Sequence, residues 1–320
     1  VDIPQNLALG LSKINDLRYG ENPHQKAGLY SFGNINDKSL VGANIFQGKE
    51  LSYNNFLDTN TAMRCSQEFN DPCCVIVKHV NPCGVAISDN ITNAYEKAFE
   101  TDPESAFGGV IAVNRTVDEN FATKLISNQF VEVIIAPDYD VGALEVFKQK
   151  NNIRVISVQG YKKNRIDFQI QSIDGGFLVQ EDDHKIITTE DLNCVTEKKP
   201  NQDETADLMF AWIVAKYVKS NAIVFAKNRQ TIGIGAGQMS RVSSAKIASL
   251  KATNANLDTT GTVMASDGFF PFSDSIEMAS DNGINCIIQP GGSIKDQDVI
   301  DEANKKDIAM VFTGMRHFRH

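Results

Sequence analysis

Short apolar runs alternate with amphipathic stretches along the whole chain. The first clear run, Val-Ile-Val at residues 75–77, predicts a buried strand, and a helical pattern follows around residues 94–99. Strands that alternate with helices in this way are typical of βαβ units, so the pattern predicts an α/β fold with a mostly parallel sheet. The next predicted elements are strands at residues 110–113 and 133–136 and a helix at residues 120–127.

A similar order of elements returns in the second half of the chain, without a strong repeat of the sequence itself. Between about residues 161 and 200 the apolar pattern loosens and charged clusters appear, a basic pair at residues 162–163 and an acidic run at residues 181–183. We therefore expect two domains, at residues 1–185 and 186–320. The elements predicted after the loosened segment are helices at residues 206–217, 241–252, 274–282 and 296–305 and strands at residues 222–226, 232–237, 262–265, 286–288 and 309–312.

Composition and charge narrow the class of protein. Of the 320 residues, 42% are hydrophobic and 22% are charged, which are ordinary values for a globular chain. The net charge of -9 gives a field that repels phosphodiester backbones and anionic lipids, so we expect no nucleic-acid partner and no membrane partner. A phosphorylated small molecule is compatible with this charge, because a few Arg and Lys side chains in a cleft dominate at short range.

Six cysteines are scattered along the chain without the spacing of a small disulfide-bonded domain. The sequence also lacks an apolar run near the roughly 20 residues that cross a bilayer, and it lacks a signal-peptide pattern. We therefore expect a cytoplasmic protein with reduced thiols. Because the chain opens at Val1 rather than at an initiator Met, we also expect it to be a processed product or part of a longer polypeptide.

The segment Lys-His-Val-Asn-Pro-Cys-Gly, residues 78–84, is the strongest candidate for a chemical role. It follows a predicted strand, and open α/β sheets bind ligands at the carboxyl ends of their parallel strands. Lys78 and His79 would place a cation beside an imidazole there, which is a workable acid/base pair near neutral pH. The alternative is a surface lysine beside a histidine that caps the following turn, and for an isolated Lys-His pair this alternative is favoured.

His79 and the Pro82-Cys83 pair resemble the zinc-binding pattern of nucleobase deaminases. That pattern requires a proton-shuttling glutamate two residues after the histidine and a second cysteine three residues after the first. Asn81 and Ala86 occupy these positions, so the segment cannot form the tetrahedral zinc site. We therefore predict chemistry without a catalytic metal.

Gly-Ile-Gly-Ala-Gly at residues 233–237 resembles a dinucleotide-binding fingerprint. Its third glycine comes one position too early, however, and no acidic residue ends a strand about 20 residues later, so a Rossmann cofactor site is not expected. Ser240 and Arg241 instead open a predicted helix whose amides can face an anion. The alternative, that the glycines only permit close packing, is equally compatible with the residues.

Two loops carry groups suited to recognition. The stretch Arg-Tyr-Gly-Glu-Asn-Pro-His-Gln at residues 18–25 is too irregular for a helix or a strand. Its arginine offers a planar fork for phosphate and its tyrosine a rigid donor, unless Arg18 simply pairs with a carboxylate in a connector. In the second loop, at residues 267–272, three phenylalanines beside Gly and Pro can form a wall for a flat aromatic ligand or anchor the loop to the core.

In this order, the segments resemble the aminoimidazole-carboxamide ribonucleotide (AICAR) transformylase part of the bifunctional purine-biosynthesis enzymes, whose other part is inosine monophosphate (IMP) cyclohydrolase. The resemblance implies two cytidine-deaminase-like three-layer α/β/α subdomains and a homodimer with active sites at the subunit interface. It also implies that the N-terminal cyclohydrolase domain of the family is missing from this sequence. The resemblance runs from about residue 17 to residue 320 and rests on the segments above together with Phe107-Gly108, Ser220-Asn221 and Arg316.

The reaction implied by this resemblance transfers the formyl group of the co-substrate 10-formyltetrahydrofolate to the 5-amino group of AICAR, giving FAICAR in the penultimate step of IMP synthesis. His79 would be the general base, and Lys78 would stabilise the oxyanion and the leaving group. Two other classes stay open, a zinc-dependent nucleobase deaminase-like enzyme and a non-catalytic nucleotide-binding module. The implied nucleotide contacts are Arg18, Tyr19, Gly108, Glu132, Asn221, Arg241, Phe269 and Arg316, and the implied folate contacts are Val242, Asp274, Ser293 and Ile294.

Overall fold

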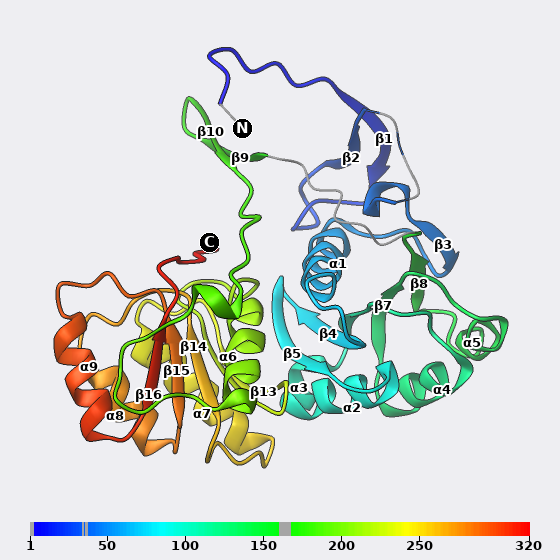
Figure 1. The fold of residues 1–320 in the computed structure, drawn as a ribbon. Helices are drawn as coiled ribbons and strands as arrows, with labels where there is room; N and C mark the ends of the chain where they lie inside the picture. The colour runs from blue at the N-terminus through cyan, green and yellow to red at the C-terminus, as the bar shows by residue number, and fades with distance from the viewer. Residues whose placement is uncertain (1–2, 34, 36–37, 160–167) are drawn as a thin grey trace.

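A computed structural model describes residues 3–33, 35, 38–159 and 168–320 of the chain. The expectations for residue 1 and for residues 162–163 lie outside this part. A 12-stranded mixed sheet forms the centre of the described molecule (Figure 1). Its strands are β3 (Asn44–Gln47), β4 (Cys73–Lys78), β5 (Asn81–Ile87), β6 (Gly109–Val113), β7 (Val131–Ala136), β8 (Arg154–Ser157), β11 (Asn193–Cys194), β12 (Ile223–Lys227), β13 (Gln230–Gly235), β14 (Val263–Ser266), β15 (Cys286–Gln289) and β16 (Ala309–Phe312).

The strands fall into two halves with the same topology. Their order across the sheet is β11-β16-β15-β14-β12-β13-β5-β4-β6-β7-β8-β3. In the first half β4 is antiparallel to β5 and β6, the strands β6, β7 and β8 run parallel, and β3 closes the sheet antiparallel to β8. In the second half β12 to β16 and β11 repeat this arrangement strand for strand. The similar order of elements in the sequence is thus a structural duplication.

The two halves meet where β5 pairs with β13, a junction that we call the seam. The two strands are antiparallel there, with Ala86 opposite Gln230. Beside this pair, the hydroxyl of Thr231 accepts a hydrogen bond from the amide of Val85 at 2.9 Å and donates one to the carbonyl of Val85 at 3.1 Å. A side chain thus supplies bonds that the short ladder lacks, and the two halves form one continuous sheet.

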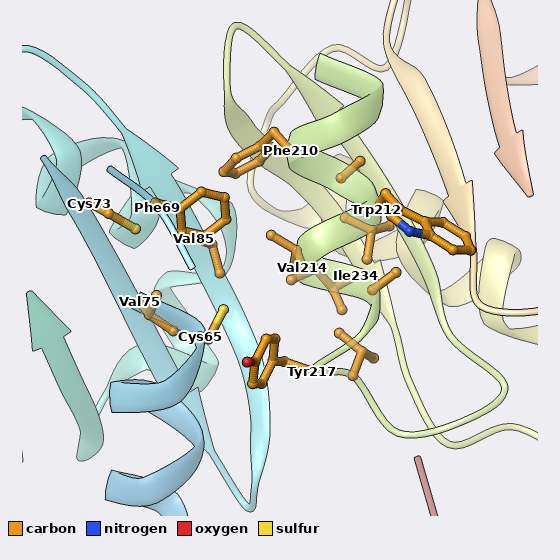
Figure 2. Close-up of a cluster of buried hydrophobic side chains, with 14 of the residues drawn as sticks. Cys65, Phe69, Cys73, Val75, Val85, Phe210, Trp212, Val214, Tyr217 and Ile234 are labelled. Atoms are coloured by element: carbon orange, nitrogen blue, oxygen red, sulfur yellow. The ribbon is translucent and has the colours of Figure 1, made fainter. Parts of the chain in front are cut away.

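Helices cover both faces of the sheet and give the molecule three layers. On one face, α1 (Tyr53–Ser66) and α6 (Gln202–Ala215) share a single apolar core that continues across the seam. Figure 2 shows this core, in which Phe69 of the first half meets Phe210 of the second with 5.5 Å between ring centroids. The other face carries a separate core in each half. Its helices are α2 (Ile91–Thr101), α3 (Pro103–Ala106), α4 (Glu119–Asn128) and α5 (Val141–Phe147) in the first half, and α7 (Arg241–Asn254), α8 (Asp274–Asp281) and α9 (Asp296–Lys305) in the second.

Two β-ribbons lie outside this sheet. One is formed by β1 (Leu11–Leu17) and β2 (Ala27–Phe32), and the other, which we call the arm, by β9 (Phe168–Ile173) and β10 (Gly176–Glu181). The arm projects away from the body (Figure 1). Among the described helices, none is long and apolar enough to cross a membrane.

Most helices and strands of the sheet lie where the apolar pattern predicts them, and the α/β fold with helices on both faces is confirmed. The prediction of a mostly parallel sheet is wrong, because each half contains only two parallel strand pairs. The pattern also missed β5, since Pro82 and Gly84 interrupt its apolar residues. The arm was missed as well, within the segment where the pattern loosens.

Two strands carry a glycine where a helix backbone comes close, at the same place in each half. A Cβ atom on Gly84 in β5 would lie 1.9 Å from the carbonyl oxygen of Ala98 in α2. A Cβ atom on Gly233 in β13 would lie 2.2 Å from the carbonyl oxygen of Ala248 in α7. Close packing is therefore sufficient to explain Gly233, the first glycine of the run at residues 233–237.

Replacing Gly84 by Ala should lower the free energy of unfolding by about 1–3 kcal/mol, because α2 must move to admit the methyl group. Urea titration followed by far-ultraviolet circular dichroism measures this change. Gly176→Ala is the matched control, since Gly176 also lies in a strand but has nothing within 4 Å of its Cβ position. Equal stability of the two variants would contradict the packing role of Gly84.

Candidate active site

The candidate residues of the first half lie along one edge of the sheet, which we call the site edge. Lys78 ends β4 there, and Gly108 immediately precedes β6, which is antiparallel to β4. Because β7 runs parallel to β6, Glu132 near its start lies at the same edge. The expectation that Lys78 and His79 follow a parallel strand is wrong, since β4 is antiparallel to both of its neighbours.

The second half brings its candidate residues to the same edge. Asn221 precedes β12, Arg241 follows β13 and Arg316 follows β16, and these strand ends coincide because β12 is antiparallel to β13 and β14. Across the seam, the side-chain oxygen of Asn81 accepts a hydrogen bond from the amide of Lys219 at 2.9 Å. The two sets of residues therefore form one continuous strip.

His79 and Val80 form the two-residue turn between β4 and β5. Both have left-handed backbone angles, with φ of 52° and 64°, a conformation that is costly for a β-branched residue such as Val80. The carboxylate of Asp58 in α1 stabilises the turn by accepting a hydrogen bond from the amide of Val80 at 2.6 Å. Burial raises the pKa of Asp58, against the effect of this hydrogen bond and of the nearby His79.

The second half contains a copy of this turn without the histidine. Asn228 and Arg229 connect β12 to β13 with φ of 52° and 55°, and Asp207 in α6 accepts the amides of both, at 2.8 and 2.6 Å. Asn is at ease in a left-handed turn, whereas Val80 is not. Ease of turn formation therefore does not explain the sequence of the first turn, which favours a chemical role for its exposed imidazole, that of His79.

Lys78 lies beside the turn and donates hydrogen bonds to two backbone carbonyls, that of Phe107 at 2.9 Å and that of Gly108 at 3.0 Å. An ammonium group has three N–H donors, so one is left for a ligand. The copy repeats the first of these contacts, since Lys227 donates to the carbonyl of Thr260 at 2.8 Å. The lysine contact is thus part of the fold, and the first half differs in combining it with a histidine.

Arg241, the first residue of α7, lies against a buried carboxylate. Its Nη2 atom is 3.5 Å from Oδ1 of Asp267, which is 0% exposed and also accepts the hydroxyl of Ser220. Burial lowers the pKa of Arg241, although the nearby charge of Asp267 acts in the opposite direction. Burial likewise raises the pKa of Asp267, although the hydrogen bond from Ser220 and the charge of Arg241 oppose this shift. The Nε–H of Arg241 is buried and has no hydrogen-bond partner among the described residues.

A second guanidinium lies close to the first. Arg316 lies 4.4 Å and Arg241 lies 5.6 Å from the centroid of the Phe318 ring. The charge of Arg316 adds to the lowering of the pKa of Arg241. Arg316 makes no ion pair with a described residue, so Asp267 offsets only one of the two charges. This arrangement favours binding of an anion such as a phosphate group.

The phenylalanines of the loop after β14 differ in exposure. Phe270 is 0% exposed and belongs to the core of the second half, whereas Phe269 is 36% exposed. Phe272 is 63% exposed, so Phe269 and Phe272 both have a face open to solvent, and Phe270 anchors the loop. The anchoring role is thus seen for Phe270, and the ligand-wall role stays a prediction for the exposed residues.

The N-terminal loop at residues 18–25 is ordered by hydrogen bonds within it, as the sequence predicts for a structured loop. The side chain of Asn54, at the start of α1, donates to the carbonyl of Glu21 at 3.2 Å. Because α1 starts at the site edge, this contact brings the loop there. The guanidinium of Arg18 lies 5.7 Å from the centroid of the Tyr19 ring.

The remaining candidates also reach the site edge. The carboxylate of Glu132 is already paired there, 2.7 Å from Nη1 of Arg154. The four residues expected to contact folate follow β13, β14 and β15, whose ends lie at this edge, and Ile294 among them is wholly exposed. They are Val242 in the first turn of α7, Asp274 at the start of α8, and Ser293 and Ile294 in the loop before α9.

Several residues of the site edge were not predicted from the sequence, chiefly Asp58, Asp267 as the partner of Arg241, and Arg319. The guanidinium of Arg319 donates to the carbonyl of Tyr217 at 2.6 Å and to the hydroxyl of Thr61 at 2.8 Å, so the C-terminal tail contacts both halves. No local pattern marks such residues, because their partners lie far away in the sequence.

Comparison with known proteins gives a match to one protein family. The family model described as AICARFT/IMPCHase bienzyme matches residues 1–251, a range that includes Lys78, His79 and Arg241. A solved structure described as a structural-genomics protein, ybgI, of unknown function is 8% identical over 65% of this chain and 72% of that chain, with a TM-score of 0.15. A likeness of that size carries no argument.

Proposed function

We propose that this chain, which belongs to the AICARFT/IMPCHase bienzyme family, carries the formyltransferase activity of that family. Membership makes it an enzyme of purine nucleotide synthesis, either the formyltransferase or the cyclohydrolase. The reaction we propose transfers the formyl group of 10-formyltetrahydrofolate to the 5-amino group of AICAR and gives FAICAR. We expect it to take place in the cytoplasm.

The observation that carries this proposal is a histidine in a turn with a lysine directly before it, on the same edge as two neighbouring arginines. Formyl transfer to a nucleotide needs a base for the amine, a cation for the developing oxyanion and a site for the phosphate. His79 and Lys78 meet the first two needs, and Arg241 and Arg316 meet the third. The copied turn has the lysine without the histidine, so this combination belongs to one half.

In the proposed reaction the 5-amino group attacks the formyl carbon, a C–N bond forms, and the bond from that carbon to the folate nitrogen breaks. The amine is a weak nucleophile because its lone pair is delocalised into the ring, so its proton must leave as the bond forms. His79 accepts this proton. Lys78 first directs its remaining N–H at the negative formyl oxygen, and this same proton then passes to the folate nitrogen as its bond to the formyl carbon breaks. A proton passing from His79 to Lys78 restores the enzyme.

The other expected contacts would align the two substrates along the site edge. The exposed face of Phe269 suits the flat carboxamide-imidazole ring. The loop at residues 18–25 and the side chain of Asn221 offer hydrogen-bonding groups near it. Along the folate we place Val242, Asp274, Ser293 and Ile294, with Ile294 offering apolar surface to the pterin or benzoyl group.

The test is to mix the purified protein with AICAR and 10-formyltetrahydrofolate and to follow FAICAR by ultraviolet absorbance. Product that depends on both substrates is the expected result. A parallel reaction starts from FAICAR and follows IMP, because this step separates the cyclohydrolase from the formyltransferase. Formation of IMP without any formyl transfer would overturn the proposal.

Replacing Arg316 by Ala should raise the KM for AICAR by roughly 10–100-fold and change kcat little, because the arginine binds the phosphate equally in the ground and transition states. Steady-state kinetics at saturating folate give both constants. Arg229→Ala is the matched control, since Arg229 is an exposed arginine paired with Asp71 at the end of the sheet away from Lys78. Unchanged kinetics in Arg316→Ala would remove this residue from the site.

We also propose that the active form is a homodimer with its sites at the subunit interface. The support is apolar surface on the two ribbons, where Phe32 is 61% exposed and Phe177 is 70% exposed. Light scattering should give roughly twice the mass of one chain, 35.2 kDa. A monomeric mass in the active protein would contradict this assembly.

A further inference from the structure

Two adjacent carboxylates, Asp182 and Asp183, join the root of the arm to the body just after β10. Asp182 accepts a hydrogen bond from the guanidinium of Arg64 in α1 and forms an ion pair with it. Asp183 faces the second half, where Nδ1 of His317 lies 2.5 Å from its Oδ2 and Nζ of Lys216 lies 3.7 Å from its Oδ1. The acidic run seen in the sequence thus connects the arm to both halves.

His317 is a buried residue in an irregular tail. Residues 313–320 form no helix or strand after β16, yet the His317 side chain is only 2% exposed. Its ring packs on Trp212 of α6 with 5.2 Å between centroids, and its backbone amide donates to the carbonyl of Asp267 at 3.2 Å. Figure 2 shows the ring of Trp212 on the second-half side of the shared core, so the tail is docked against that core.

His317 is next to Arg316, whose guanidinium belongs to the proposed anion site. Arg316 makes no side-chain hydrogen bond or ion pair within the described residues, and its guanidinium lies over Phe318. The position of the tail backbone therefore decides where this guanidinium lies. That backbone is held directly after Arg316 by His317 against Asp183, and two residues further on by Arg319 against the carbonyl of Tyr217.

We propose that Asp183 and His317 are positioning residues that hold the C-terminal tail so that Arg316 meets the anionic group of the substrate. This inference rests on the proposed function, in which that group is the 5′-phosphate of AICAR. Neither residue touches the substrate, and both act through Arg316. The root of the arm therefore takes part in nucleotide binding, although Asp183 and His317 lie 134 residues apart. Figure 1 shows the C-terminal end beside the segment that follows β10.

The charge of Asp183 strengthens this link. Although burial opposes the change, the hydrogen bond and charge of His317 and the charge of Lys216 lower the pKa of Asp183, so its carboxylate is ionised at neutral pH. A hydrogen bond that involves an ionised group is stronger than a neutral one. Exchanging the carboxylate for the isosteric amide should therefore loosen the tail without leaving a cavity.

The experiment compares AICAR with its unphosphorylated riboside by isothermal titration calorimetry. In Asp183→Asn, the Kd for AICAR should rise roughly tenfold, which matches loss of one charge-assisted hydrogen bond, while the Kd for the riboside stays the same. The KM for AICAR should rise in parallel and kcat should not change. Asp71→Asn is the matched control, an aspartate in an exposed pair with Arg229 at 2.8 Å, and it should bind AICAR like the wild type.

Variants of His317 test the pair itself. His317→Asn keeps an N–H near the place of Nδ1 and should retain the wild-type Kd for AICAR, whereas His317→Leu lacks the donor and should bind as weakly as Asp183→Asn. The double variant Asp183→Asn/His317→Leu should bind no more weakly than the weaker single variant, because both changes remove one interaction. Far-ultraviolet circular dichroism shows whether each variant is folded.

Three results would each overturn the positioning role: an unchanged Kd for AICAR in Asp183→Asn, an equal loss for the riboside, or effects that multiply in the double variant. Each of them leaves the proposed function standing, provided that the wild-type protein still forms FAICAR. A wild-type protein that neither binds AICAR nor forms FAICAR would overturn both.

Discussion

Replacing His79 by Asn should reduce the kcat of formyl transfer by about 10²–10⁴-fold and leave the Kd for AICAR nearly unchanged. Asn suits the left-handed turn, as Asn228 does in the copy, so the substitution removes the imidazole and preserves the backbone. Steady-state kinetics and calorimetry with AICAR measure the two constants. Weakened binding with normal turnover per bound complex would contradict the role of His79 as the base.

The reciprocal change Asn228→His is the matched control. It places an imidazole in the equivalent turn at the other end of the sheet, away from Arg241 and Arg316. We expect wild-type kinetics in this variant, and no recovery of turnover when it is combined with His79→Asn. Recovery would mean that the reaction does not depend on the site edge.

Replacing Lys78 by Met should lower kcat by about 10²–10³-fold, the usual cost of removing one electrostatic donor to a developing oxyanion. The substitution keeps an unbranched stem of similar shape but removes the ammonium group and its charge. It also removes the hydrogen bonds to the carbonyls of Phe107 and Gly108, so part of any effect on activity would be structural.

The copy in the second half separates these two contributions. Lys227→Met removes the equivalent hydrogen bond, to the carbonyl of Thr260, at a place far from the proposed chemistry. Its effect on the free energy of unfolding should resemble that of Lys78→Met, while kcat should stay at the wild-type value. If the two variants lost kcat equally, Lys78 would be a structural residue only.

The periodicity of apolar residues located most of the central elements because each of these has a face in a core, but it did not locate α1, α5, β3 or β8. Helix α9 and strand β16 have the predicted bounds, since polar turns flank both. Strand β5 was not recognised because Gly84 interrupts its apolar residues. A glycine is needed there because the backbone of α2 comes too close for a side chain. Strand direction was also out of reach, since a hairpin followed by a helix has the same alternation of patterns as a βαβ unit.

The site could be foreseen as a set of residue types but not as an arrangement. Lys78 and His79 are adjacent in the chain, so their proximity could be predicted without knowledge of the fold. That Arg241 and Arg316 share the ring of Phe318 depends on β13 and β16 ending at one edge of the sheet, which only the topology provides. The duplication was also hard to recognise, because the amino-acid sequences of the two halves are only weakly similar. In the structure it is evident from the two equivalent turns, which hydrogen-bond to carboxylates of α1 and α6.

A core that continues across the seam makes the two halves one cooperative unit of unfolding. Phe69 and Phe210 each bury against the other half. If one half melted alone, the surviving half would expose this apolar face, together with an unpaired edge at β5 or β13. Partial melting is therefore disfavoured, and slow amide exchange in both halves should report the same global opening. The proposed base in one half and the proposed phosphate-binding arginines in the other consequently persist, or are lost, together.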